Sequence, residues 1–119
     1  MKLYDVQKKY NNFKYPKEFL KIIRLNIVDL DFWYLMDERQ VEFRINELKE
    51  RYPKRNLIPF ARRDDNDDIA CFEVNKGDRV QIIHDYSSEG YEQRKEYNNF
   101  WNWFRDAIEE MIEEGEYDE

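Results

Sequence analysis

The sequence predicts a single α+β domain with an antiparallel-rich central sheet, packed by N-terminal, middle and C-terminal helices. The main observation lies in residues 57–85, where three apolar segments alternate with short polar turns, as in an antiparallel meander. A second is the helical spacing of apolar side chains over residues 100–112, with shorter helical repeats earlier in the chain. With 119 residues, 41% of them apolar, the chain is long enough for one core, so we expect residues 1–119 to form one domain.

Two short helices are expected in the first 24 residues. Leu3, Val6 and Tyr10 fit the first, within residues 1–14, which we treat as an N-terminal extension of the domain. Pro16 suits the first turn of the second helix, because the amide hydrogen that proline lacks would have no partner there. The apolar face of this second helix comprises Phe19, Leu20, Ile22 and Ile23.

A strand and a third helix are expected next. Residues 27–36 alternate between an apolar face and a mixed face, which is typical of a single strand half covered by a helix. Pro53 is expected to end the helix that follows, and Phe43 lies off its apolar stripe. This stripe comprises Val41, Ile45, Leu48 and Tyr52.

The meander is expected to contain three strands, joined by short connections. The strands span residues 57–62, 69–74 and 79–85. Pro59 cannot donate to a ladder, so it predicts either an edge position or a bulge in the first of them. Residues 75–78 are expected to form a tight hairpin turn in which Gly77 is free to adopt a positive φ, and residues 87–90 mark a loop.

The closing helix, residues 100–112, has the strongest helical pattern in the chain. Asn98 or Asn99 is expected to cap it and Gly115 to end it. Its carboxylates lie opposite the apolar face and continue into an acidic tail at residues 113–119. Because acids near a helix C-terminus oppose the helix dipole, we expect them to serve solubility, a basic partner or the chain's own basic N-terminal segment.

Charge is distributed unevenly along the chain. The net charge is −7, yet residues 106–119 hold eight carboxylates and no base, whereas residues 1–24 hold seven bases and two acids. A nucleic-acid-binding protein needs a basic stripe interleaved with aromatics, and the acidic end opposes the small basic patch. We therefore expect no nucleic-acid partner.

Features that the sequence lacks indicate the cellular compartment that we expect for the protein. The single cysteine, Cys71, cannot form an internal disulfide, and no apolar run is long enough for a membrane span or a signal peptide. We therefore expect a cytoplasmic protein with no membrane partner.

Four aspartates within residues 64–68 suggest a calcium site, which their surroundings do not support. A loop of EF-hand type that begins at Asp64 needs glycine at its sixth position and glutamate at its twelfth, where this chain has Ile69 and Asn75. Two interpretations are left: a solvated hairpin tip that bonds its own backbone, or an acidic patch that docks a basic partner. The aspartates are Asp64, Asp65, Asp67 and Asp68.

His84 and Asp85 raise the question of catalysis. A histidine beside an aspartate can act as a general base, but the candidate nucleophiles are Cys71, in an apolar strand, and the loop serines Ser87 and Ser88. We expect His84 to lie at a strand end, bonded to backbone or to Asp85. No catalytic or phosphate-binding motif accompanies the pair, so the sequence predicts no enzyme, no cofactor and no metal site.

Some of the aromatic residues are candidates for partner contacts. Trp103 lies on the apolar stripe of the closing helix, Trp101 lies off it, and Trp33 lies on the less apolar face of its strand. Exposed aromatic side chains beside charges are typical hot spots of protein interfaces, and Tyr91 is a further candidate. The alternative is that these side chains form a second packed layer.

Four short motifs are spread over residues 15–112. They are the opening segment Tyr15–Leu20, the central segment Leu57–Ala61, the acidic turn and strand Asp65–Phe72, and the closing segment Phe100–Phe104. In this order and spacing they resemble the SUKH superfamily, which contains a yeast regulator of cell-wall synthesis and many bacterial immunity proteins that neutralise polymorphic toxins. Where many members have Asn-Gly or other glycines after the first conserved helix, this chain has Asn26 followed by Ile27.

The resemblance implies an α+β fold and, for a bacterial member, a non-enzymatic protein that binds a cognate toxin domain, often a nuclease or deaminase, and blocks its active site. We therefore predict a cytoplasmic immunity protein, monomeric or weakly dimeric, whose partner is a basic toxin domain. The alternative is a regulatory or scaffold protein similar to the yeast regulator. The candidate partner-binding residues are Asp64, Asp65, Asp67, Asp68, Trp33, Tyr91 and Trp101.

Overall fold

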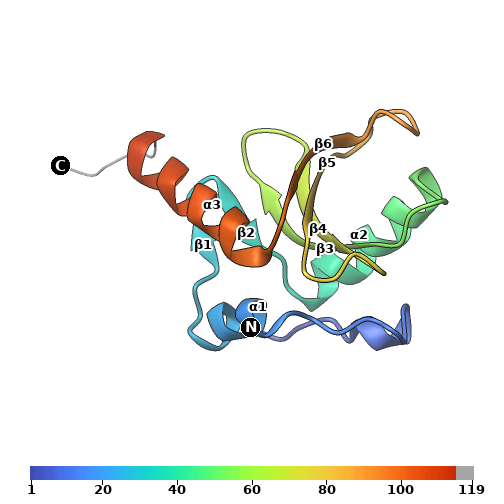
Figure 1. Ribbon diagram of the computed structural model, residues 1–119, viewed down its shortest axis with the longest axis horizontal. Coiled ribbons are helices and arrows are strands. Elements are labelled where there is room, and N and C mark those ends of the chain that lie inside the picture. Colours follow the sequence, from blue (N-terminus) through green and yellow to red (C-terminus); the bar gives the residue numbers. More distant parts are fainter. Residues whose placement is uncertain (115–119) are drawn as a thin grey trace.

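The computed structural model describes residues 1–114, which fold into three α-helices, one turn of 3₁₀ helix and a six-stranded sheet (Figure 1). The strands are β1 (Asp29–Leu30), β2 (Trp33–Leu35), β3 (Leu57–Arg63), β4 (Asp68–Glu73), β5 (Val80–His84) and β6 (Gln93–Tyr97). The helices are η1 (Val6–Lys8), α1 (Lys17–Arg24), α2 (Glu38–Arg51) and α3 (Phe100–Glu114). The strands follow one another in the sheet in chain order, each antiparallel to its neighbours. The predicted α+β class and meander are confirmed.

Two parts of the sheet differ from the sequence prediction. The expected single strand at residues 27–36 is divided into β1 and β2, because Asp31 adopts a φ of 73° and donates its amide hydrogen to Asp29 Oδ1 at 2.9 Å. An aspartate that bonds backbone two residues on favours a turn over an extended chain. Strand β6 was not predicted, because its five exposed or half-exposed residues show no apolar alternation. Charged side chains of this kind protect the edge of a sheet.

Pro59 lies in β3 beside a bulge, so the bulge alternative is confirmed. It pairs with Cys71 of β4, whereas β2 pairs with residues 61–63 of β3. The pairing of β3 with β4 shifts register between Pro59 and Ala61. The extra residue is Phe60, whose carbonyl accepts a hydrogen bond from the Met36 amide at 2.9 Å. The turn at residues 75–78 also forms as predicted, with Gly77 at a φ of 60°.

The helix ends follow local capping rules. Helix α1 begins directly after Pro16, and α2 begins with a capping box in which Asp37 and Gln40 bond each other's backbone amides. Asn99 caps α3 as predicted, since its Oδ1 accepts the Asn102 amide hydrogen at 2.9 Å. The predicted end of this helix at Gly115 lies outside the described residues.

The sheet is covered on both faces, because successive residues of a strand point to opposite sides. In β4, Phe72 belongs to the larger hydrophobic cluster, whereas Ile69 and Cys71 belong to a smaller cluster on the other face. The smaller cluster also contains Leu48 and Tyr52, from the C-terminal part of α2. Helix α2 therefore covers one face of the sheet.

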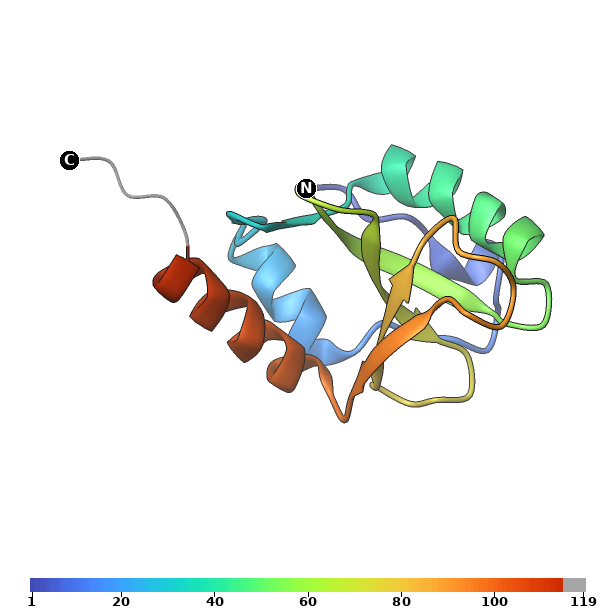
Figure 2. The same cartoon turned by 90° about the horizontal axis from the view of Figure 1, so that it is seen from above.

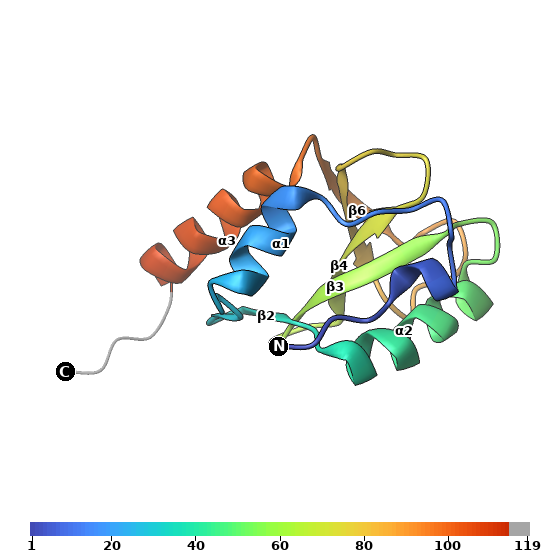
Figure 3. The same ribbon diagram turned by 90° about the horizontal axis from the view of Figure 1, so that it is seen from below.

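The larger cluster is built around aromatic rings on the other face. The rings of Phe60 and Phe72 stack with their centroids 4.4 Å apart. Phe19 of α1 and Phe100 of α3 pack against Phe60 at centroid distances of 5.5 and 5.7 Å. Helices α1 and α3 therefore lie side by side against this face (Figure 3).

Residues 1–14 contribute to the same core. Only Val6–Lys8 are helical, as one 3₁₀ turn, so the first predicted helix is much shorter than expected. Val6 and Phe13 are nevertheless buried, and the Phe13 ring lies 5.9 Å from that of Phe72. The N-terminal extension is thus part of the packed structure.

A buried ion pair joins the connection between α2 and β3 to the sheet. Arg55 donates to Glu73 and to Glu92 at 3.0 Å each, and both carboxylates are buried. Desolvation opposes ionisation of Glu92, but hydrogen bonds from its own backbone, from Arg55 and from the Gly90 amide outweigh it. The pKa of Glu92 therefore lies below its ordinary value of 4.5.

Acid should destabilise the protein through Glu92. A carboxyl whose pKa is lower in the folded state stabilises that state fully above the unfolded pKa and loses this contribution as pH falls through the folded pKa. We expect the free energy of unfolding in urea to be level from about pH 7 to about pH 5.5 and then to fall towards pH 3.

The variant Arg55→Met tests the cause of this acid sensitivity. It leaves two buried carboxylates unpaired, so it should lower stability at pH 7 by about 3 kcal/mol. Because Glu92 then lacks the hydrogen bond from Arg55 that lowers its pKa, the stability of the variant should fall less steeply than that of the wild type between about pH 5 and about pH 3. Lys54→Met, at the exposed neighbouring residue, should match the wild type. If the free energy of unfolding of Arg55→Met and of the wild type fell equally with falling pH, the pairing of Arg55 with Glu92 would not be the cause of the acid sensitivity.

Candidate functional site

A groove of about 570 Å³ lies between α3 and the sheet. In Figure 2, α3 follows β6 and then runs away from the sheet. The floor is formed by Trp33, Ile82, Trp103 and Ala107. The α3 wall carries Asp106, Glu109, Glu110, Glu113 and Glu114, and the sheet wall carries Arg63, Asp68, Arg94 and Lys95. Six carboxylates therefore face three cations, and the groove is acidic.

Arg63 connects this groove to the tip of the β3–β4 hairpin. Its guanidinium donates to Asp65 at 2.7 and 3.0 Å and to Glu110 of α3 at 2.8 and 3.0 Å. Hydrogen bonds from Arg63 lower the pKa of Asp65, and the two carboxylates raise the pKa of Arg63. One guanidinium thus holds both carboxylates in a fixed geometry. We call the hairpin tip (Asp64, Asp65, Asp67) and the six groove carboxylates the acidic surface.

The structure separates the four hairpin aspartates by role. Asp64 and Asp67 are exposed, whereas Asp65 is held by Arg63. Asp68 is half-buried in the groove wall, where Arg94 Nε lies 2.7 Å from its Oδ1. Asn66 Oδ1 accepts the Asp68 amide hydrogen, so the tip does bond its own backbone, as one of the two interpretations expects.

The aromatic candidates do not form one surface with the tip. Trp33 is only 5% exposed and packs edge-on against Trp103, with centroids 5.6 Å apart. The expectation that Trp33 is an exposed contact is therefore wrong, because α3 covers its face of β2. Tyr91 is 82% exposed in the β5–β6 loop, and Trp101 is half-exposed beside α1. Neither lines the groove.

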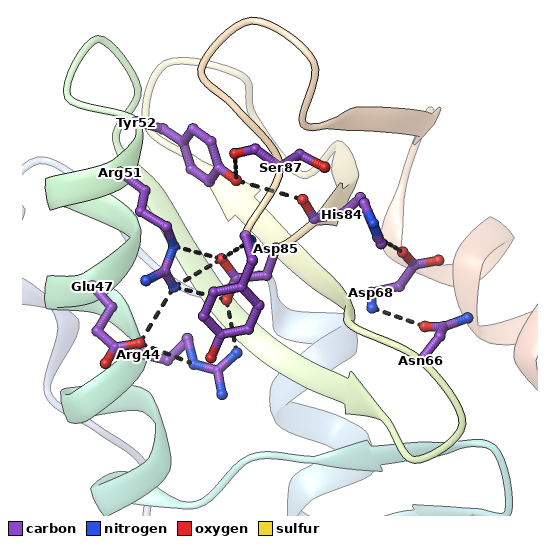
Figure 4. A network of polar contacts seen from close by, with 10 residues as sticks. Arg44, Glu47, Arg51, Tyr52, Asn66, Asp68, His84, Asp85 and Ser87 are labelled. Carbon is purple, nitrogen blue, oxygen red and sulfur yellow. Dashed lines mark hydrogen bonds and ion pairs between the residues drawn. The ribbon is translucent and has the colours of Figure 1, made fainter.

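His84 and Asp85 point in different directions, as Figure 4 shows. His84 Nδ1 lies 3.3 Å from Asp68 Oδ1, so its predicted bond to backbone or to Asp85 is wrong. Asp85 is buried and accepts hydrogen bonds from Arg51 and Arg44 of α2 at 2.8 Å. Cys71 is also buried, and burial raises the pKa of its thiol, so it is a poor nucleophile.

Sequence reasoning missed the partners of Asp85. Arg44 and Arg51 lie off the apolar stripe of α2 and resemble solvated charges in the sequence. In the structure, Tyr86 covers both, with its ring centroid 4.4 Å from the Arg51 guanidinium, and it adopts a φ of 70°. Such a φ is rare for a bulky residue, and the Asp85 Oδ1 that accepts the Tyr86 amide hydrogen helps to hold it. The signal available in the sequence was an aspartate at the end of an apolar strand, where a buried carboxylate needs a partner.

The α3 carboxylates that form ion pairs do so with the sheet. Glu110 pairs with Arg63, and Asp106 lies 3.5 Å from Lys95 and accepts the Tyr97 hydroxyl hydrogen bond at 2.9 Å. Pairing with the basic N-terminal segment, one of the three roles expected for the α3 carboxylates, is therefore not observed for these two residues.

Residues 1–114, which the structure describes, lack the features of two other classes of site. No group of three or more His, Cys, Asp or Glu side chains in that part of the chain is placed to hold a metal ion. None of the helices there is long and apolar enough to cross a membrane.

The fold and the groove define a small α+β domain built on an antiparallel meander with helices on both faces. The chain belongs to the SMI1 / KNR4 family (SUKH-1), whose family model matches residues 2–106. This confirms the resemblance to the SUKH superfamily, a family that is generally non-catalytic. No curated protein and no solved structure matches the chain.

The motifs that carry the resemblance meet in the core, and two of them also supply groove residues, Asp68 and Trp103. Phe19, Phe60, Phe72 and Phe100 come from the four motifs and contact one another. The family match ends at residue 106, so four of the five carboxylates on the α3 wall lie beyond it. The family match thus covers the core, and of the α3 wall it covers Asp106 alone.

Asp85→Asn should destabilise the protein without changing its shape. The buried carboxylate balances two arginines, and its loss should lower the free energy of unfolding by about 2 to 3 kcal/mol. Urea unfolding at neutral pH measures this. Asp67→Asn, at an exposed site in the nearby hairpin, is the matched control and should stay within about 0.5 kcal/mol of the wild type. A similarly small effect of Asp85→Asn would show that the network does not hold α2 to the sheet.

Proposed function

We propose that this protein is a non-enzymatic immunity protein that neutralises a cognate polymorphic toxin, a nuclease or similar, by binding it stoichiometrically in the cytoplasm. The observation that carries the proposal is the acidic surface, which joins the hairpin tip to the α3 wall of the groove. Family membership supports it, because the SUKH superfamily includes many bacterial immunity proteins.

Charge complementarity explains how such a surface neutralises a nuclease. A protein that acts on nucleic acid needs a basic cleft to hold the phosphates. An acidic surface competes for that cleft with the substrate, and opposite charges accelerate the encounter. In this proposal the protein occupies the place of the polyanion and needs no catalytic group.

Different residues of the acidic surface are proposed to play different roles. Asp64 and Asp67 are exposed and steer the approaching partner. Asp65 and Glu110 are fixed by Arg63 and present carboxylates that lose little conformational freedom on binding. A lysine or arginine of the partner can enter the groove with its charge near the α3 wall and its aliphatic part on the aromatic floor. Tyr91 and Trp101 are proposed as contacts outside the groove.

Reversing the charge of the tip should weaken binding and leave folding unchanged. We expect Asp65→Lys with Asp67→Lys to raise the dissociation constant for the toxin domain about tenfold or more, because like charges then meet. Calorimetric titration measures it, with the toxin domain that co-purifies from native lysate as the probe. Asp78→Lys with Glu89→Lys makes the same charge change at exposed sites outside the acidic surface and should bind as the wild type does. Equal affinity for both double variants would exclude the tip.

The identity of the partner tests the function itself. Co-purification at low and moderate salt should recover one basic protein with a toxin-type domain, bound less tightly at the higher salt. Cells that produce this toxin should grow only when the present protein is produced with it. Recovery of cell-wall or signalling proteins alone, or no rescue of growth, would instead favour a regulatory scaffold similar to the yeast regulator of cell-wall synthesis.

A further inference from the structure

A second charged surface, of opposite sign, lies on α1 and the start of α3. A hollow of about 500 Å³ there is lined by Lys17, Glu18, Leu20, Lys21, Arg24 and Trp101. Its three cations are exposed, and none forms a side-chain hydrogen bond or ion pair with another residue of the described chain. Leu20 is 43% exposed beside them. We call these residues the basic hollow.

The cations of the basic hollow are not explained by the helix that carries them. Lys21 and Arg24 lie in the last turn of α1, where cations favour the helix dipole, but Lys17 lies in the first turn, where they oppose it. Elsewhere, arginines such as Arg51, Arg55 and Arg63 are paired with carboxylates. The basic hollow is therefore a concentration of unpaired positive charge next to exposed apolar side chains.

One face of α3 carries both signs of charge. Trp101 and Ile112 are eleven residues apart, which is three turns of an α-helix, so they share this face. Arg105 lies one turn after Trp101, at the end next to the basic hollow. Glu109 and Glu113 lie beside Ile112, which is 50% exposed, at the other end. The face therefore runs from positive to negative along the helix.

We propose that two copies of this protein associate through this face, with their α3 helices antiparallel. The basic hollow of each copy then faces Glu109 and Glu113 of the other, and Ile112 meets Leu20 and Trp101. Trp101 and Ile112 are about 16 Å apart along the helix, so both contacts form at once about a two-fold axis midway between them. Such an interface is isologous, because the same residues serve on both sides.

A second copy is the occupant that the chemistry of this chain favours. The basic hollow is complementary to an acidic segment that carries an apolar residue. The end of α3 is such a segment, with Glu109, Ile112 and Glu113. Carboxylates near a helix C-terminus oppose the dipole, and cations of a second copy offset that cost. Because the paired charges stay exposed, the dimer should be weak and sensitive to salt. The inference does not rest on the proposed function.

The dimer would also compete with a basic partner. Glu109 and Glu113 belong both to this interface and to the acidic wall of the groove. Binding of a basic protein to the acidic surface should therefore dissociate the dimer, because the same carboxylates cannot serve both.

Charge-swap variants test the arrangement with the full chain alone, by sedimentation equilibrium up to millimolar protein. The wild type should dimerise, with a dissociation constant about tenfold or more higher at about 0.5 M than at about 0.05 M salt. Lys17→Glu with Lys21→Glu, and Glu109→Lys with Glu113→Lys, should each be monomeric. An equal mixture of these two variants should restore a dimer of mixed composition, because both contacts then again join opposite charges.

Controls separate this inference from loss of folding and from the proposed function. Urea unfolding checks that each variant is folded, and Lys54→Glu with Lys76→Glu changes charge by the same amount at exposed sites away from α1 and α3. This control and Asp65→Lys with Asp67→Lys should both dimerise as the wild type does. A wild type that stays monomeric at low salt, swap variants that dimerise alone, or a mixture that does not pair would each overturn the proposal.

Discussion

The stack of Phe60 on Phe72 is the contact on which the remaining structure depends. It joins the two longest strands of the meander at the point where Pro59 forces a bulge, and it provides the surface that both α1 and α3 cover through Phe19 and Phe100. Aromatic pairs of this kind combine large buried area with a preferred geometry. Since α3 takes its position from this stack, so does the groove that α3 forms with the sheet.

The opposite face of the sheet is organised by charge as well as by apolar packing. Asp85 and Glu92 are buried at the two ends of the β5–β6 loop, and each is balanced by arginines on or next to α2. A buried carboxylate without a partner is costly, so these pairs allow few alternative positions for the helix. The buried ion pairs on this face stabilise the fold, whereas many of the charged side chains around α3 are exposed to solvent.

The family match covers the core of the domain more fully than it covers the exposed carboxylates of α3. The motifs that resemble the SUKH superfamily contribute phenylalanines that meet in the aromatic core, and the match to the SMI1 / KNR4 family ends before most of the acidic wall. A domain of this kind can keep its core and change its exposed charges, so partner choice can vary while the fold stays the same.

The sequence by itself determined α3, the three-stranded meander and the turn at Gly77, because their signals are apolar repeats and conformational preferences among near neighbours. It also located the acidic hairpin tip, but it misplaced Trp33 and did not detect β6 or the partners of Asp85. Arg44 and Asp85 are 41 residues apart, and only the tertiary structure decides that they meet. Burial and ion pairing of this kind depend on which surfaces the folded chain brings together, and no local pattern records that.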